Sequence, residues 1–498
     1  MTIQNETFNY KPLPNEKEGF QVMGGSLEIL RRETQIWGIS KLMKLGADIP
    51  QNIMRAEQIT KAIETGRQRF DILHNADIGM PMDKDLEIQP IIDQANLDAA
   101  NFINEHSKYQ RYTNSQGLPE LRNSVANFYQ KFWGLNINQS WVVASNGASE
   151  MWQRFVASQL APGDLVMTLD PHYNPFDVDL AMKGAGWVPI KTKAENGFHF
   201  NEDDLSRAFK EKKENQPLGR IKAVYINSPA NPTGVVYTEK EINILVDFAL
   251  RNNLFIVMDG VYSLYNYSNN PTLMDYLKNL LEDKRKLVYN KLVFLDSMSK
   301  LATTTGERIG INFVPNDNLR DQLGRALSVR GNPQNHGQLQ SSYILDRLTE
   351  DYTQNRSPEK KSILEERRKL YFHKMHLFYE QFYKNAGAHV LNKSREPEGG
   401  LYIPLLLDGN KVNALDFFDF SMNQFIGHNI SDKKHATSFV PMAVTFPDGS
   451  SASFRVGDFE QAQKEIRVCI GLDVSEINDA AEALANQLIE YNLSLSKD

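Results

Sequence analysis

A lysine that follows a strand-like segment is the residue best suited to chemistry in this sequence. Lys300 ends the run Ser297-Met298-Ser299-Lys300, and Arg308 follows eight residues later. Burial lowers the pKa of a lysine amine and makes it nucleophilic toward an aldehyde. Two serine hydroxyls and a guanidinium beside it suit a phosphate dianion. The run therefore predicts a reactive amine next to a phosphate site, although a lysine after a serine is more often a surface residue.

Two upstream segments place further polar side chains at expected strand ends. Residues 227–234 read Asn-Ser-Pro-Ala-Asn-Pro-Thr-Gly, a composition that by itself requires only a tight turn. Asp259 ends a very apolar strand, and Tyr262 follows it by three residues. A buried carboxylate needs a cationic partner, and a protonated pyridine ring would supply one and act as an electron sink. The alternative for Asp259 is a helix N-cap or a structural ion pair.

These residues together resemble the fold-type I enzymes of the class I and II aminotransferase family, which use pyridoxal 5'-phosphate. The resemblance covers roughly residues 70 to 490 and implies that Lys300 carries the cofactor as a Schiff base and acts through a quinonoid. It also implies that Asp259 keeps the ring nitrogen protonated. The residues that carry the resemblance, in family order and approximate spacing, are Asn231, Asp259, Tyr262, Ser297, Ser299, Lys300 and Arg308.

The resemblance assigns a role to each of these residues and to several others. Asn231 and Tyr262 would bind the phenolic oxygen of the cofactor, and Asn231 would also line the substrate site. Ser297, Ser299, Arg308 and the turn Gly147-Ala148-Ser149 would hold the phosphate. Tyr173 would stack on the ring as a catalytic residue beside Lys300 and Asp259. The remaining motif residues are Gly79 in the substrate pocket, Arg467 as the clamp for the substrate carboxylate, and Tyr112, which would reach the phosphate of the neighbouring subunit in a homodimer.

The elements that must position these residues alternate between strands and helices. Strand-like runs lie at 141–145, 165–169, 223–227, 255–259, 292–297 and 309–314, with amphipathic segments such as 239–253 between several of them. With the resemblance, this alternation predicts an α/β fold. Its large cofactor domain would hold a mainly parallel seven-stranded sheet flanked by helices, next to a smaller α+β domain.

The expected boundaries place the large domain at 95–340 and the small domain at 71–94 and 341–498. The small domain contains a long helix over 359–387, strands at 400–407 and 465–471, and a closing helix near 475–492. Residues 408–464 show few clear elements and read as a lid-like insertion or a loop. Residues 1–70 form an N-terminal extension, in which 26–46 have helical spacing and suit a packing or dimer arm.

The amino-acid composition favours an enzyme that acts on small molecules. The 498 residues are 41% apolar and carry a formal net charge of −7 without a block of like charge, which argues against a nucleic-acid or membrane surface. No apolar run spans a bilayer, no signal peptide is expected, and the single Cys469 fits a cytoplasmic location. No metal site is expected, because His373 and His376 at this spacing usually lie on a helix surface.

The function that these motifs predict is transamination of an α-amino acid to a 2-oxo acid. The alternative is another reaction of the same cofactor, namely β- or γ-elimination or replacement, decarboxylation, or an oxidation by O₂. Aspartate-type enzymes carry an arginine five residues before an Asn-Pro pair, where this chain has Leu327, and Gly331 replaces a common serine. The substrate side chain is therefore not expected to be a short acid, unless Arg325 or Arg330 supplies the charge.

Overall fold

A seven-stranded sheet forms the centre of the larger part of the protein. The computed structural model describes residues 72–74, 76, 81, 88–173, 175–215, 219–326, 333–355, 361–390, 393–407, 412–423, 428–430, 433–437, 439–445, 451–453 and 464–495. The sheet order is β2 (Val142–Asn146), β8 (Ile309–Phe313), β7 (Leu292–Leu295), β6 (Phe255–Asp259), β5 (Arg220–Asn227), β3 (Asp164–Asp170) and β4 (Gly186–Lys191).

All neighbouring strands of this sheet are parallel except β8, which runs antiparallel to both β2 and β7. The predicted mainly parallel seven-stranded α/β sheet is confirmed. Strand β4 was missed, because its sequence Gly-Trp-Val-Pro-Ile-Lys mixes apolar residues with a glycine and a proline. It lies at the sheet edge, where a proline is tolerated.

Helices cover both faces of the sheet. Neighbouring residues of β6 show this directly, since Ile256 and Val257 belong to different buried apolar clusters. Side chains of successive strand residues point to opposite faces, so each cluster is the core of one face. One cluster includes residues of α5 (Ala148–Gln159), α6 (Pro175–Lys183) and α12 (Asp317–Arg325), and the other includes residues of α4 (Pro119–Phe128), α8 (Glu239–Arg251) and α13 (Asn335–Gln354).

Helix α8 shows how local sequence produces this covering. Thr238 caps its first turn and forms a capping box with Glu241. Ile242, Leu245 and Ala249 then recur at helical spacing and are buried against the sheet. The other helices of the larger part are α3 (Ile88–Glu105), α7 (Glu202–Asn215), α9 (Leu273–Asn279), α10 (Glu282–Tyr289) and the short α11 (Met298–Leu301).

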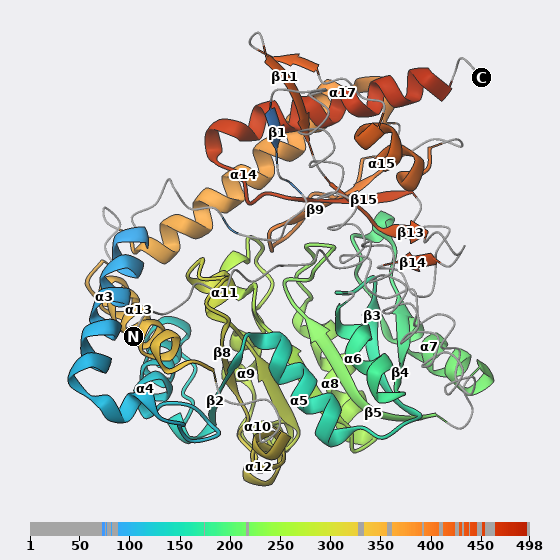
Figure 1. The fold of residues 1–498 in the computed structure, drawn as a ribbon. Helices are drawn as coiled ribbons and strands as arrows, with labels where there is room; N and C mark the ends of the chain where they lie inside the picture. The colour runs from blue at the N-terminus through green and yellow to red at the C-terminus, as the bar shows by residue number, and fades with distance from the viewer. Residues whose placement is uncertain are drawn as a thin grey trace, which may run out of the picture.

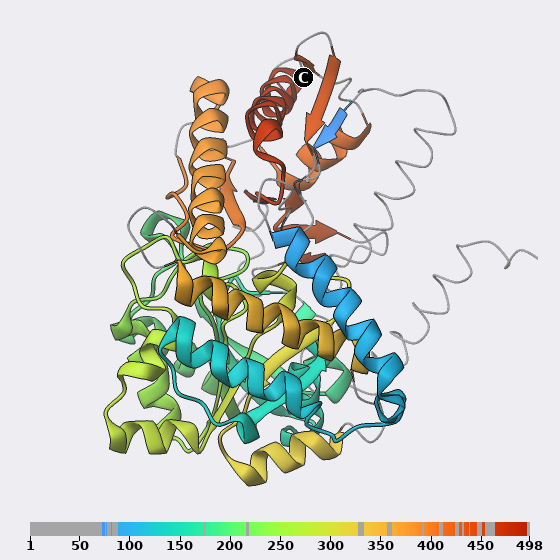
Figure 2. The same ribbon diagram turned by 90° about the vertical axis from the view of Figure 1, so that its left-hand side faces the viewer.

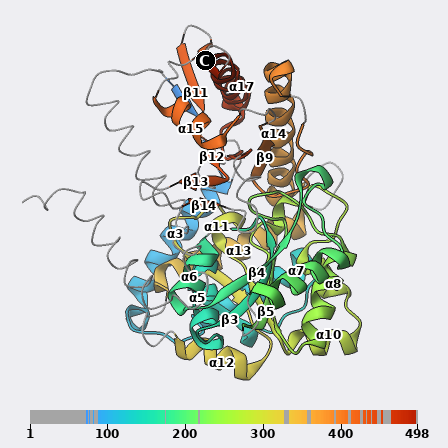
Figure 3. The ribbon, with the colours of Figure 1, turned by 90° about the vertical axis from the view of Figure 1, so that its right-hand side faces the viewer.

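The smaller part lies above the carboxyl edge of the sheet, with α11 between the two parts (Figure 1). Helices α14 (Ile363–Ala386) and α17 (Ile477–Leu495) pack side by side in both side views (Figure 2 and Figure 3). Strand β15 (Glu465–Cys469) pairs antiparallel with β9 (Tyr402–Leu406) and β12 (Val440–Pro441). The remaining strands are β1 (Ile72–His74), β10 (His428–Ile430), β11 (Lys433–Thr437), β13 (Ala443–Thr445) and β14 (Ser451–Ser453).

Residues 408–464 hold more regular structure than expected. The described positions contain α15 (Ala414–Asn423) and five short strands, β10 to β14. Polar segments such as Lys433–Thr437 carry no apolar alternation of their own, and they become strands because β1 and β10 pair with them on either side. The predicted helix at 26–46 lies outside the described residues, and the domain boundaries stay a prediction. Among the described residues, no helix combines the length and apolar character needed to cross a bilayer.

A glycine turn joins the two parts. The carbonyl of Gly234, in the 227–234 turn, accepts hydrogen bonds from the backbone N–H groups of Glu398 (3.0 Å) and Gly399 (2.8 Å), just before β9. Gly234 has a φ of +68°, and a Cβ at this position would lie 2.6 Å from Pro397 Cβ and 2.9 Å from Gly399 O. The conformation and the close approach therefore both require glycine.

Substitution Gly234→Ala is expected to lower the free energy of unfolding by about 2–5 kcal/mol. A side chain in the left-handed region costs about 1–2 kcal/mol, and the clash with fixed backbone adds about 1–3 kcal/mol. Denaturant unfolding measures the change. Gly306→Ala is the matched control, because a Cβ there meets nothing within 4 Å. Equal stability of the two variants would contradict the joining role of Gly234.

Candidate active site

Polar residues gather at the carboxyl edge of the seven-stranded sheet. Strands β2, β3, β5, β6 and β7 point the same way, so their last residues meet at one edge. In open α/β sheets this edge is where ligands bind. The residues at these strand ends are Asn146, Asp170, Asn227 and Asp259, with Ser297 two residues beyond β7.

Lys300 lies on α11, directly beyond this edge. Ser297 caps the helix by accepting a hydrogen bond from the N–H of Ser299. The Lys300 Nζ atom is 5.9 Å from the centre of the Tyr262 ring. Removal of water from the amine lowers the pKa of Lys300 to about 8, with Cys469 opposing the shift and the charge of Arg467 adding to it. At neutral pH such an amine is still mostly protonated, but a far larger share of it is neutral than for an ordinary lysine.

The backbone of α11 is held by side chains from elsewhere in the fold. The hydroxyl of Tyr265 donates to the carbonyl of Lys300 at 2.8 Å. Arg367, from the first turns of α14, donates to the carbonyl of Leu301 and to Thr303 Oγ1 (2.7 Å). These bonds fix the direction in which the Lys300 side chain leaves the helix.

Asp259 is a buried carboxylate with two neutral donors. Its Oδ2 accepts from the Tyr225 hydroxyl at 2.6 Å, and its Oδ1 accepts from the N–H of Val261 at 3.2 Å. Burial raises the pKa of Asp259 to about 6, and the bond from Tyr225 opposes this rise. Within the described part of the chain, no hydrogen bond or ion pair joins Asp259 to a cation. A cationic ring nitrogen is therefore a fitting partner for it.

The predicted phosphate residues lie around the start of α5. Gly147 is the N-cap of α5 with a φ of +79°, and a Cβ on it would lie 2.5 Å from Arg308 Nη2. Arg308 itself has a φ of +58°, a conformation that is uncommon for a residue with a side chain and often marks a functional site. The Ser297 and Ser299 hydroxyls are 3.0 Å apart. Free N–H groups of a helix start, two hydroxyls and a guanidinium fit a phosphate dianion.

Arg467 lies on β15, and its charge acts on the Lys300 amine. It is buried, its Nη1 donates to Asn231 Oδ1 at 3.3 Å, and its guanidinium lies over the Tyr402 ring at 4.6 Å from the ring centre. The Tyr402 and Tyr262 hydroxyls are 2.8 Å apart. The structure therefore brings Asn231, Tyr262 and Arg467 together, as a carboxylate site beside a reactive amine requires.

The other predicted residues differ in where they lie: some are near this group, Tyr112 is on the surface, and some are outside the described residues. Tyr112 is 99% exposed on the surface of the single chain. Tyr173, half-buried after β3, is close enough to affect the pKa of Tyr225 and of Tyr262. Ala148 and Ser149 begin α5 next to Gly147. The residues that lie outside the described part are Gly79, Leu327, Arg330 and Gly331.

Sequence reasoning missed Tyr225, Tyr402 and the pairing of His172. Tyr225 and Asn227 are two residues apart on β5 and so face the same side, which was the available signal for Tyr225. Tyr402 stood in the predicted strand at 400–407 without a polar neighbour to mark it. His172 is buried and bonds Asp177 at 2.6 Å. Burial opposes protonation of His172, but Asp177 outweighs it and raises the pKa.

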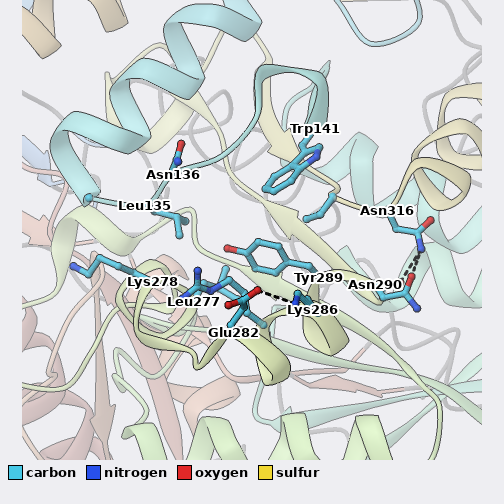
Figure 4. Close-up of a pocket in the computed structure, with 13 residues that line it drawn as sticks. Leu135, Asn136, Trp141, Leu277, Lys278, Glu282, Lys286, Tyr289, Asn290 and Asn316 are labelled. Carbon is cyan, nitrogen blue, oxygen red and sulfur yellow. Dashed lines mark hydrogen bonds and ion pairs between the residues drawn. The ribbon is translucent and has the colours of Figure 1, made fainter.

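A pocket of about 590 Å³ lies at the other edge of the sheet (Figure 4). Trp141 precedes β2 and Asn290 lies just before β7, so both mark strand starts, opposite to Lys300. The lysines lining the pocket already have acidic partners, since Lys286 pairs with Glu282 at 2.8 Å and Lys278 with Asp275 at 2.9 Å. This pocket is separate from the candidate active site.

The residues at the carboxyl edge fit pyridoxal 5'-phosphate. Asp259 can pair with a protonated ring nitrogen, the Lys300 amine can react with the aldehyde, and the residues around Gly147 and Arg308 can bind the phosphate. In the described part of the chain, no group of three or more His, Cys, Asp or Glu side chains is arranged to hold a metal ion. His376 instead pairs with Glu396 at 2.9 Å on the surface of α14.

Comparison with known proteins gives consistent matches. The sequence model of a family described as Aminotransferase class I and II matches residues 82–484. The sequence is 27% identical over 309 residues to an aspartate aminotransferase of Bacillus subtilis, covering 62% of this chain and 70% of that protein. It is 29% identical over 261 residues to 1-aminocyclopropane-1-carboxylate synthase 9 of Arabidopsis thaliana, covering 51% of this chain and 53% of that protein. The chain spans about half the length of the first curated relatives it matches.

Solved structures share the fold at low sequence identity. Alanine aminotransferase of Pyrococcus furiosus superposes with a TM-score of 0.68 at 19% identity, covering 90% of this chain and 99% of that one. A mutant aspartate aminotransferase of Thermus thermophilus gives a TM-score of 0.65 at 20% identity, covering 87% and 96%.

Substitution Tyr225→Phe is expected to weaken binding of pyridoxal 5'-phosphate by the cofactor-free protein about tenfold at pH about 6, and by less at pH about 8. The variant loses a hydrogen bond that favours the ionised form of Asp259, so the carboxyl is protonated over a wider pH range and attracts a pyridinium less. The acid limb of the pH profile of activity moves to higher pH for the same reason. Spectroscopic titration with the cofactor measures the affinity.

Tyr276→Phe is the matched control for this change. Its hydroxyl donates to Asn243 Oδ1 at 2.9 Å, away from the strand ends, and its loss should leave cofactor affinity unchanged. Wild-type affinity of Tyr225→Phe across the whole pH range would show that this hydroxyl does not influence Asp259.

Proposed function

The chain belongs to the class I and II aminotransferase family, whose members depend on pyridoxal 5'-phosphate, and on that ground we propose that it transfers the amino group of an α-amino acid and yields a 2-oxo acid. The observation that carries the proposal is the Lys300 amine, with a pKa lowered to about 8. It lies beyond the sheet edge at which the buried carboxylate Asp259 ends β6, and it is near enough to the buried guanidinium of Arg467 for that charge to act on it. In this arrangement Lys300 is the nucleophile, Asp259 pairs with the cofactor ring, and Arg467 binds the carboxylate of the same substrate.

Bound pyridoxal 5'-phosphate supplies an aldehyde for the lysine amine and a ring that accepts the electron pair left when a proton departs from the substrate Cα. Lys300 would hold the cofactor through this aldehyde, and its neutral amine, once released by the substrate amine, would serve as the base that takes the Cα proton and as the acid that gives it back. Asp259 holds the proton on the ring nitrogen. The phosphate is held by the N–H groups at Gly147–Ser149 and by Ser297, Ser299 and Arg308.

Arg467 binds the substrate through its carboxylate. A planar guanidinium offers two parallel N–H groups, and its bond to Asn231 fixes the plane in which they point. Asn231 and Tyr262 bind the phenolic oxygen of the cofactor, and Tyr173 stacks on the ring, with Gly79 in the substrate pocket. A neutral, aromatic or basic side chain is proposed for the substrate because Leu327 offers no charge to a second carboxylate.

Two further features complete the proposal. The protein acts as a homodimer in which Tyr112 reaches the partner's phosphate site, a role that suits its 99% exposure in the single chain. Sedimentation of a fully active monomer would contradict this role. Relatives named 1-aminocyclopropane-1-carboxylate synthase, and not aminotransferase, support a second candidate, a reaction of the same cofactor on an amino acid other than transamination, such as an elimination or replacement.

A panel of amino acids tests the proposed reaction. The protein loaded with pyridoxal 5'-phosphate is expected to change its visible absorbance with an amino acid alone and to recover it on addition of a 2-oxo acid. Reduction with borohydride should attach the cofactor to Lys300, identified by peptide mapping. An absorbance change that no 2-oxo acid reverses would favour the elimination-type reaction, and a tag on another lysine would contradict the assignment of Lys300.

The same panel, repeated with Arg467→Lys, separates the carboxylate clamp from the chemistry. A lysine offers a point charge in place of two parallel donors, so the concentration for half-maximal change should rise about 10-fold or more for every substrate. Unchanged half-maximal concentrations would show that a residue other than Arg467 binds the substrate carboxylate. If aspartate or glutamate is the best amino donor of the wild type, the inference from Leu327 that the substrate side chain is not a short acid is wrong.

A further inference from the structure

Tyr402 connects the two halves of the candidate site. It begins β9, is 2% exposed, and pairs with Cys469 of β15, two residues from Arg467 on the same strand. Its hydroxyl lies 2.8 Å from the Tyr262 hydroxyl, and its ring face lies under the Arg467 guanidinium at 4.6 Å. One side chain therefore contacts both the predicted cofactor ligand Tyr262 and the predicted substrate ligand Arg467.

Either hydroxyl of this pair can donate by geometry, and the Arg467 guanidinium over the Tyr402 ring favours donation by Tyr402. Burial raises the pKa of both hydroxyls, but only for Tyr402 is the rise opposed by Arg467. The more acidic hydroxyl is the better donor, which favours Tyr402 as the donor and Tyr262 as the acceptor. The proton of Tyr262 is then available to a third group, and accepting one hydrogen bond makes a hydroxyl a stronger donor of its own.

We propose that Tyr402 is a positioning residue that couples the occupancy of Arg467 by a carboxylate to the strength of the hydrogen bond that Tyr262 donates to the cofactor. This inference rests on the proposed function, in which Tyr262 binds the phenolic oxygen of pyridoxal 5'-phosphate and Arg467 binds the substrate.

The direction of the coupling follows from the charges. A carboxylate on Arg467 neutralises much of the charge over the Tyr402 ring, which makes Tyr402 a weaker donor and Tyr262 a weaker donor in turn. The phenolic oxygen then keeps more of its negative charge and holds more tightly the proton it shares with the Lys300 nitrogen. Binding of a carboxylate should therefore raise the pH midpoint of the cofactor's visible absorbance transition.

The experiment is a pH titration of the absorbance of the loaded wild-type protein, with and without saturating propionate, at an ionic strength matched with chloride. Propionate has a carboxylate but no amine, so it occupies Arg467 without reacting. The midpoint should rise by about half a pH unit or more with propionate, the size expected for a change in one hydrogen bond.

Two substitutions at Tyr402 separate its two contacts. Tyr402→Phe keeps the ring under Arg467, so it should raise the midpoint without propionate, abolish most of the propionate shift, and change the KM of the best amino donor by less than about twofold. Tyr402→Leu removes the ring as well and should raise KM about fivefold or more. A merely structural role would move KM and stability without removing the propionate shift.

A double-mutant cycle and a control make the result specific. In the background Tyr262→Phe, the change Tyr402→Phe should have no further effect on the midpoint, because the acceptor is gone. Tyr276→Phe, which loses a hydroxyl bonded to Asn243 outside the site, should behave as wild type. A full propionate shift in Tyr402→Phe would overturn the coupling. A wild type with no pH transition and no tag on Lys300 would instead overturn the proposed function.

Discussion

Removal of water from ionisable groups at the carboxyl edge of the sheet is the constraint on which the candidate site depends. It acts in opposite directions on the two central residues, raising the pKa of Asp259 to about 6 and lowering that of Lys300 to about 8. An acid and a base whose pKa values are brought toward neutrality from opposite sides can both change protonation near neutral pH. Strands β9 and β15, which carry Tyr402 and Arg467, supply part of this environment from the smaller part of the protein.

The position of β9 depends on the 227–234 turn. Besides its backbone bond to Gly234, Glu398 accepts hydrogen bonds through its side chain from the Val236 N–H (3.2 Å) and from His199 (3.3 Å). Hydrogen bonds with Glu241 and Glu398 raise the pKa of His199 to about 9. Because the folded-state pKa is raised, the stabilisation is complete below the ordinary histidine pKa of about 6.5 and is lost as the pH rises through about 9. The connection is therefore largely intact at neutral pH.

Two buried carboxyl groups show how similar residues acquire different roles. Asp259 and Asp296 each accept a tyrosine hydroxyl, from Tyr225 and Tyr129, and burial raises the pKa of both. Asp296 also accepts the N–H of Ser297 at 2.7 Å and so supports the turn into α11. Asp259 is the last residue of β6, at the edge where Lys300 lies, and its position rather than its chemistry suits it to bind a ligand.

The sequence by itself determined the α/β class of fold, six of the strands, the helices α8, α14 and α17, and the motif residues around Lys300, because each of these is written in local periodicity or in a short run of residue types. It did not reveal β4 or the strands within 408–464, since their polar or irregular sequences become strands only through their pairing partners. Nor did it reveal Tyr225 or Tyr402. Only the tertiary structure decided which hydroxyl meets Asp259 and which ring lies under Arg467, because residues 34 and 65 positions apart come together only when their strands pair and pack.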